Sequence, residues 1–110
     1  MIIEKDQDIT FLKADENTVS DFFIVFKEKY SNFKRANIIL DFSDLKGVKT
    51  ENISLFLQLS ENHRNDGTSF VVVVEDIDFD SLSDKIIAVP TLQEAKDIIE
   101  MEKIERDLGF

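Results

Sequence analysis

Hydrophobic and polar positions along the chain alternate between short apolar runs and stretches with a helical period. Apolar runs at residues 1–3 and 9–12 flank a polar stretch and predict an opening β-hairpin. Runs at 38–40, 70–74 and 86–89 predict three further strands. The run at 70–74, FVVVV, has no polar alternation, which is typical of a strand covered on both faces at the centre of a sheet.

Three longer segments have the apolar spacing of amphipathic helices. After a capping residue at Thr18, the first segment carries one narrow apolar stripe, which predicts a helix packed on a core. The stripe consists of Val19, Phe22, Phe23, Phe26, Tyr30 and Phe33. A second helix is predicted over residues 50–65, and a third begins after the capping box Thr91-Leu92-Gln93-Glu94 and ends near Leu108, before Gly109.

The order of these elements predicts the fold class. Strands and helices alternate after the hairpin, which favours parallel crossover connections. We expect a single α/β domain over residues 1–110, with a small mixed β-sheet and helices packed mainly on one face of it.

Composition and charge narrow the range of partners. A net charge of −10 argues against nucleic acid or an anionic membrane as the main ligand. The chain has no cysteine, which excludes disulfides and thiolate sites. Residues 1–8 turn acidic after the first apolar residues, unlike a signal peptide, and no apolar run reaches membrane-spanning length. We expect a soluble cytoplasmic domain without a cofactor.

Few residues in the chain suit catalysis. Three isolated glycines form neither a dinucleotide-binding nor a phosphate-binding loop. His63 has no second histidine or cysteine for a metal site or a triad, and its helical position predicts a structural residue at the boundary of the buried face. Alternate carboxylates in residues 75–80 could bind a hard cation, but Ser81 and Ile87 stand where a calcium loop needs glycine and glutamate. We expect a solvated acidic loop with its apolar side chains turned inward.

Thr50 follows an apolar strand and a polar loop, at the predicted start of the second helix. Its hydroxyl could cap that helix by accepting a hydrogen bond from a backbone N–H. A phosphate at the same position would be stabilised by the helix dipole, so a phosphorylatable switch is the second hypothesis. Local chemistry favours the cap, a role that threonine fills well. The neighbouring Asp44 and Glu51 would also repel a phosphate somewhat.

Residues 40–67, LDFSDLKGVKTENISLFLQLSENHRNDG, resemble the signature of STAS domains, the anti-sigma factor antagonist family. The ending VPTLQEAKDII is similar to the last strand and helix of that family. The resemblance implies a small cytoplasmic α/β domain that binds partner proteins and has no enzymatic activity. In bacterial partner-switching systems a serine kinase phosphorylates the residue at the helix start, which releases the antagonist.

Position by position, Thr50 corresponds to the phosphorylatable residue of the family and Asp41 to the aspartate at the strand end. The resemblance gives a candidate partner-binding surface of Asp41, Lys49, Thr50, Glu51 and Leu55. Lys49 stands where the family usually has aspartate, and only residues 80–84 stand where the family has a full helix.

Three functions follow, in order of preference. The first is a non-enzymatic, regulatory interaction module whose partner is a serine/threonine kinase-type anti-sigma factor. The second is an accessory subunit that dimerises with or stabilises a neighbouring enzyme without a phosphorylation switch, which the departures at Lys49 and Glu51 favour. The least favoured is a small metal-dependent enzyme that uses the acids of residues 75–80.

The last predicted helix carries two apolar stripes. The first, expected to lie on the sheet, consists of Leu92, Ala95 and Ile99. The second is rotated from it by more than a quarter turn, and one flat core cannot bury both stripes of a straight helix. A bent or frayed helix end is one explanation. Our hypothesis is self-association, most simply as a symmetric homodimer, through Met101, Ile104, Leu108 and Phe110.

Overall fold

Strands and helices alternate along residues 1–109, the part of the chain that the computed structural model describes. The strands are β1 (Ile2–Asp6), β2 (Ile9–Lys13), β3 (Asn37–Asp41), β4 (Phe70–Val73) and β5 (Ile87–Val89). The helices are α1 (Val19–Lys29), α2 (Thr50–Ser54), α3 (Leu57–Asn65) and α4 (Leu92–Asp107), with 3₁₀ turns at Tyr30–Asn32 and Phe79–Ser81. The α/β fold class predicted from the sequence is therefore confirmed.

The strands form one mixed sheet in the order β1-β2-β3-β4-β5. β1 and β2 pair antiparallel, as predicted for the opening hairpin, and the other neighbouring strands pair parallel. β4 lies between β3 and β5, and all of its residues are buried. The unbroken apolar run at residues 70–74 thus correctly predicted an interior strand.

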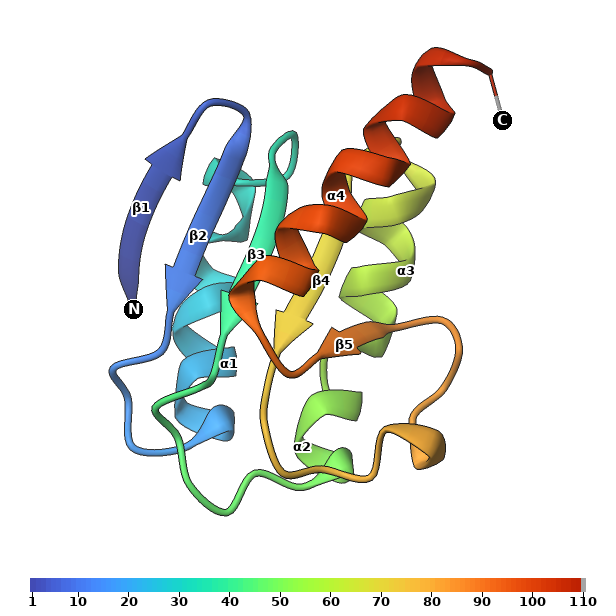
Figure 1. The fold of residues 1–110 in the computed structure, drawn as a ribbon. Helices are drawn as coiled ribbons and strands as arrows, with labels where there is room; N and C mark the ends of the chain where they lie inside the picture. Colours follow the sequence, from blue (N-terminus) through green and yellow to red (C-terminus); the bar gives the residue numbers. More distant parts are fainter. Residues whose placement is uncertain (110) are drawn as a thin grey trace.

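Helices cover the two faces of the sheet unequally (Figure 1). On one face, α1, α2 and α3 enclose the larger core, which includes Ile38, Leu40 and Val72 from the sheet. On the other face α4 lies alone, with Ala95 and Ile99 packed on a smaller core of Ile39, Val71 and Val73. The helices therefore lie mainly on one face, as predicted. Because successive side chains point to opposite sides of a strand, β3 and β4 each contribute residues to both cores.

Phenylalanine rings fill the larger core. The α1 stripe predicted from the sequence faces inward, and Phe22 and Phe26 are fully buried. Phe56 lies at the centre of the cluster, with its ring centroid 5.0 to 6.5 Å from five other rings, those of Phe22, Phe23, Phe26, Phe42 and Phe70. Two of these contacts, with Phe23 and Phe26, are edge-to-face, one of the arrangements that aromatic rings prefer.

The prediction of one continuous helix over residues 50–65 is wrong. A tight turn at Leu55 and Phe56 separates α2 from α3, and the Phe56 amide donates to the Ile53 carbonyl, three residues earlier, at 3.0 Å. A turn of this kind places residues i and i+3 on the same side of the backbone. Ile53 and Phe56 therefore stay on the inner side of the segment, and both are fully buried in the larger core.

α4 begins and ends as its sequence predicts. Thr91 Oγ1 accepts a hydrogen bond from the Glu94 amide at 3.2 Å, which caps the helix start. Gly109, with φ of +82°, follows the helix in the left-handed conformation that glycine favours. Figure 1 shows the C-terminal end of α4 projecting beyond the sheet.

Candidate functional site

Thr50 is the first residue of α2 and not its cap, so the capping role predicted for it is wrong. The capping position is held by Lys49, whose backbone N–H donates to Asn52 Oδ1 at 2.9 Å. Asn52 stands three residues after the cap and performs the part that glutamate or glutamine usually has in a capping box. The N-terminus of α2 is therefore capped without the Thr50 hydroxyl.

The shortness of α2 weakens the electrostatic argument for a phosphate on Thr50. With five residues, α2 has little more than one turn of aligned peptide dipoles. The exposed carboxylate of Glu51 follows directly and would repel a phosphate. Thr50 is nevertheless partly exposed, and Lys49 and Leu55, predicted with it as partner-binding residues, are exposed along the same segment.

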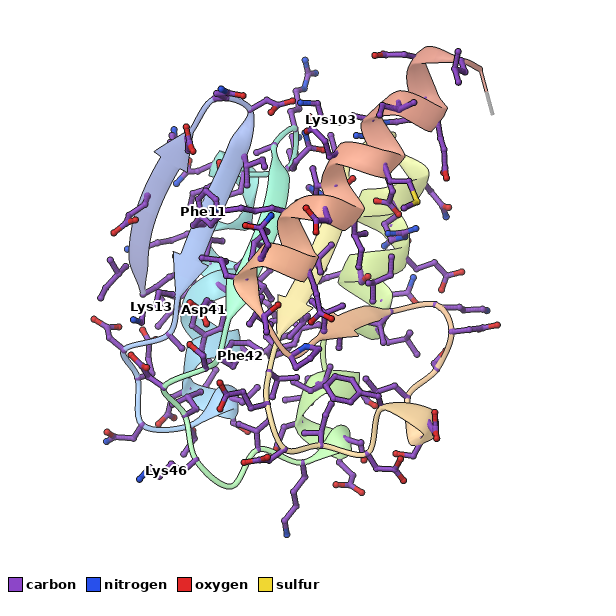
Figure 2. All side chains as sticks on the ribbon, in the orientation of Figure 1. Phe11, Lys13, Asp41, Phe42, Lys46 and Lys103 are labelled. Atoms are coloured by element: carbon purple, nitrogen blue, oxygen red, sulfur yellow. The ribbon has the colours of Figure 1, made fainter. Side chains whose placement is uncertain are left out.

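Asp41, also predicted as part of the partner-binding surface, lies at the end of β3 and not on the α2 segment. It ends β3 beside Lys13, the residue that pairs with it at the end of β2 (Figure 2). Its Oδ1 accepts a hydrogen bond from the Ser43 amide at 2.9 Å, which turns the chain after the strand. Asp41 lines a hollow of about 340 Å³ to which no residue of α2 contributes. The structure thus does not bring Asp41 and the α2 residues together around one cavity.

The hollow beside Asp41 lies between β1, β2 and the start of α4, and its charged groups already have contacts within the chain. Lys96 Nζ lies 5.5 Å from the centroid of the Phe11 ring, and Lys13 Nζ forms an ion pair with Asp44 at 2.9 Å. Glu4 adds a further carboxylate to the lining. A lining that mixes both signs of charge, with Lys5 beside Glu4 and Asp6, does not favour one class of ligand.

Residues 75–80 form the exposed acidic loop that the sequence predicts. The acidic side chains are exposed, while Ile77 and Phe79 pack against the larger core. Asp78 Oδ1 accepts a hydrogen bond from the Asp80 amide at 3.2 Å and so caps the 3₁₀ turn at Phe79–Ser81. Within residues 1–109, no three histidine, aspartate or glutamate side chains converge as ligands for a metal ion.

His63 has the structural role predicted for it, but it lies deeper than the predicted boundary position and is fully buried. Its Nε2 lies 2.7 Å from the Ala36 carbonyl oxygen, and its Nδ1 lies 2.6 Å from the Tyr30 hydroxyl. Because a carbonyl can only accept, Nε2 carries the hydrogen and Nδ1 accepts from Tyr30. Burial lowers the pKa of His63 below its ordinary value of 6.5, so the ring is neutral and links α3 to the segment before β3.

Lowering the pH from about 7.5 to about 5.5 should destabilise the protein through His63. The unfolded chain binds a proton near pH 6.5, whereas the folded protein does so only at lower pH. The stability that depends on neutral His63 is therefore complete above pH 6.5 and is lost as the pH falls below that value. The expected loss is about 1 kcal/mol, measured by urea unfolding at the two pH values. His63→Gln, which does not titrate in this range, is the control, and equal pH dependence of the two proteins would contradict a neutral buried histidine.

The three described residues of the predicted self-association stripe lie on the outer face of α4. Met101 is 59% exposed, Ile104 is 56% exposed and Leu108 is 66% exposed. At 100° per residue, the three side chains fall within about 60° of one another, on the side opposite Ala95 and Ile99. The helix is therefore not bent so as to bury this stripe on its own domain. Phe110, the fourth predicted residue, lies outside the described residues.

Polar contacts fix the C-terminal half of α4 to the domain. Lys103 Nζ binds Asp8 Oδ2 at 2.9 Å in the turn between β1 and β2, and this contact lowers the pKa of the Asp8 carboxyl. Glu102 Oε2 binds Arg64 Nη2 of α3 at 2.8 Å. Arg106 Nη1 donates to Ser69 Oγ at 3.1 Å. Rotation of α4 that turned the outer stripe inward would break all of these contacts.

Asn37 connects Arg106 to the sheet, and the sequence analysis did not identify this polar cluster. Asn37 Oδ1 accepts from Arg106 Nη2 at 3.3 Å and from the Ser69 amide at 2.9 Å, and Asn37 and Ser69 are both buried. The signal available was a polar residue directly before the apolar run of β3. Its partners lie far away along the chain, in the residue before β4 and in the last turn of α4, so only the fold reveals the cluster.

Two further observations concern the chain as a whole. Among the helices of residues 1–109, none combines the length and the apolar character needed to cross a membrane. In comparisons with known proteins, the chain matches no family model and no curated protein sequence.

Proposed function

We propose that this chain is a non-enzymatic protein-interaction module that binds a partner protein through the outer face of α4. The observation that carries the proposal is the exposed apolar stripe of Met101, Ile104 and Leu108, which we call the outer stripe. Isolated exposed apolar residues are normal on a protein surface, but a contiguous apolar patch rimmed by polar residues is typical of an interaction site.

The spacing of the outer stripe suits one mode of recognition. Its residues stand at positions i, i+3 and i+7, the pattern by which a helix places apolar anchors in a groove of a partner. Lys103 and Arg106 fix the inner side of α4 to the domain through Asp8 and Ser69, so the outer stripe is already in position before a partner binds. A preformed helix loses little conformational entropy on binding, which favours affinity.

The resemblance to STAS domains supports a regulatory form of this function in the cytoplasm. In that form, phosphorylation of the partly exposed Thr50 changes the binding of an anti-sigma factor-type kinase. The short α2 and the adjacent Glu51 favour the second form, an accessory subunit that holds a neighbouring enzyme through α4 without a switch. The two forms share the α4 surface and differ in the role of Thr50.

Affinity chromatography with the purified chain, followed by calorimetry with each purified candidate partner, tests the proposal. We expect Met101→Ser/Ile104→Ser/Leu108→Ser, the stripe variant, to bind the partner at least about 10-fold more weakly, because it exposes no apolar anchors. Ile24→Ser is the matched control, since Ile24 of α1 is 58% exposed, and it should bind like the wild type. Equal affinity of the stripe variant and the wild type for every partner would overturn the proposal.

The same calorimetry separates the two forms. Thr50→Asp leaves the fold intact and adds a negative charge at the start of α2, so it should weaken binding at least several-fold if Thr50 is a switch. Unchanged binding of Thr50→Asp, together with weak binding of the stripe variant, would favour the accessory subunit.

A further inference from the structure

We infer that the partner of α4 presents an apolar surface with a basic rim, and that a second copy of this chain does not fit the outer face. This inference rests on the proposed function and adds the chemical class of the partner. It is carried by the distribution of charge around α4, which the structure divides sharply between the inner and outer sides of the helix.

All basic side chains of α4 are held against its own domain. The residues are Lys96, Lys103 and Arg106. Lys96 lies over the Phe11 ring, Lys103 binds Asp8, and Arg106 binds the buried polar pair Asn37 and Ser69. Figure 2 shows Lys103 on the side of α4 that faces the strands. These contacts leave no basic residue of α4 directed at a partner on the outer face.

The acidic side chains have the opposite distribution. Glu102 turns inward, to Arg64, and Glu100 Oε2 lies 3.9 Å from Lys103 Nζ while its side chain stays exposed. The other carboxylates of α4 are also exposed: Glu94, Asp97, Glu105 and Asp107. On the helical wheel, Asp97 continues the outer stripe toward the start of α4, Glu105 borders one side of it, and Glu100 borders the other. The outer stripe is therefore an apolar surface bordered by carboxylates.

These carboxylates disfavour a symmetric dimer through α4. Two outer faces brought together would place their carboxylates close to one another, and like charges across an interface are unfavourable. Each chain also has a net charge of −10, so two copies repel one another as they approach. An apolar surface with lysine or arginine along its rim reverses both effects, because it pairs the outer carboxylates and speeds association.

Synthetic helical peptides test the sign of charge directly. One amphipathic peptide contains leucine and lysine, and a matched peptide contains leucine and glutamate in place of lysine. Fluorescence anisotropy with the full chain should show at least about 10-fold tighter binding of the leucine–lysine peptide, weakening as the salt concentration rises from about 0.05 to about 0.3 M. The stripe variant keeps every charge of the wild type and should lose this binding at least about 10-fold, whereas Ile24→Ser should keep it.

The charge of the outer face is tested by Asp97→Asn/Glu105→Gln. This variant keeps the outer stripe, so it should bind the leucine–lysine peptide several-fold more weakly than the wild type and with a smaller dependence on salt. Equal binding of the two peptides would overturn the basic-rim inference while leaving an apolar docking function in place. If neither peptide binds, both the basic-rim inference and the proposed function are overturned. If sedimentation velocity shows a wild-type dimer that the stripe variant abolishes, the basic-rim inference is overturned in favour of a second copy of this chain.

Discussion

Replacing Phe56 with alanine should lower the free energy of unfolding by about 3–5 kcal/mol, the largest single-residue effect that we expect for this protein. Phe56 is fully buried, and its ring contacts five other phenylalanine rings contributed by α1, β4 and the loop after β3. Truncation removes the buried apolar surface of the ring and leaves a cavity where three elements meet. Equilibrium unfolding in urea gives the measurement.

The matched control for Phe56→Ala is Ile24→Ala. Ile24 is exposed on the outer side of α1, so its truncation should change stability by less than about 0.5 kcal/mol. If Phe56→Ala cost less than about 1 kcal/mol, the cluster would not be the close-packed core described above.

Asn37→Ala should have the second-largest effect, about 2–3 kcal/mol, because it leaves the buried Ser69 amide without its partner and removes an acceptor of the Arg106 guanidinium. The Ser69 amide and the Arg106 guanidinium both donate to Asn37 Oδ1, and Asn37 Nδ2 lies 3.3 Å from Asp8 Oδ2. Urea unfolding again measures the change.

Asn32→Ala, at an exposed asparagine outside this cluster, is the control for Asn37→Ala and should be close to neutral. A cost below about 0.5 kcal/mol for Asn37→Ala would mean that water replaces the lost hydrogen bonds and that the cluster does not hold α4 in place.

The sequence was sufficient to predict the mixed sheet, its interior strand and the buried face of α1. The unbroken apolar run at residues 70–74 identified the interior strand, because only a strand covered on both faces needs apolar residues at every position. The aromatic stripe of α1 and the capping box at Thr91 were confirmed for the same reason: each depends on local spacing alone.

The break between α2 and α3 could not be predicted because no local signal marks it. Leu55 and Phe56 are not helix-breaking residues, and Ile53 and Phe56, both buried in the core, would share one face of a continuous helix as well. This break also changes the candidate site, since it leaves Thr50 on a five-residue helix capped by Lys49 and Asn52. A threonine after a polar loop is compatible with either the capping or the first helical position, and the sequence did not distinguish them.

The outer stripe of α4 was visible in the sequence as a second apolar row, but the chemistry around it was not. Its exposure follows from helical periodicity, which also places Lys103 and Arg106 on the side of Ala95 and Ile99. The contacts that hold the basic side chains there, with Phe11, Asp8 and Ser69, could not be predicted because these partners are distant along the chain. The hypothesis of self-association takes account of the apolar residues alone. With the charge division known, a partner with a basic rim is the better explanation of the same residues.

The central claim, that the outer face of α4 is where a partner protein binds, is tested most directly by photo-crosslinking from single positions of the full chain. A photoreactive side chain would replace Ile104 in one protein and Ile24, equally exposed on α1, in the other. We predict a covalent adduct with a different protein from position 104, weakened by Asp97→Asn/Glu105→Gln, and no such adduct from position 24. No adduct from position 104, the same adduct from both positions, or an adduct that contains only two copies of this chain would contradict the account.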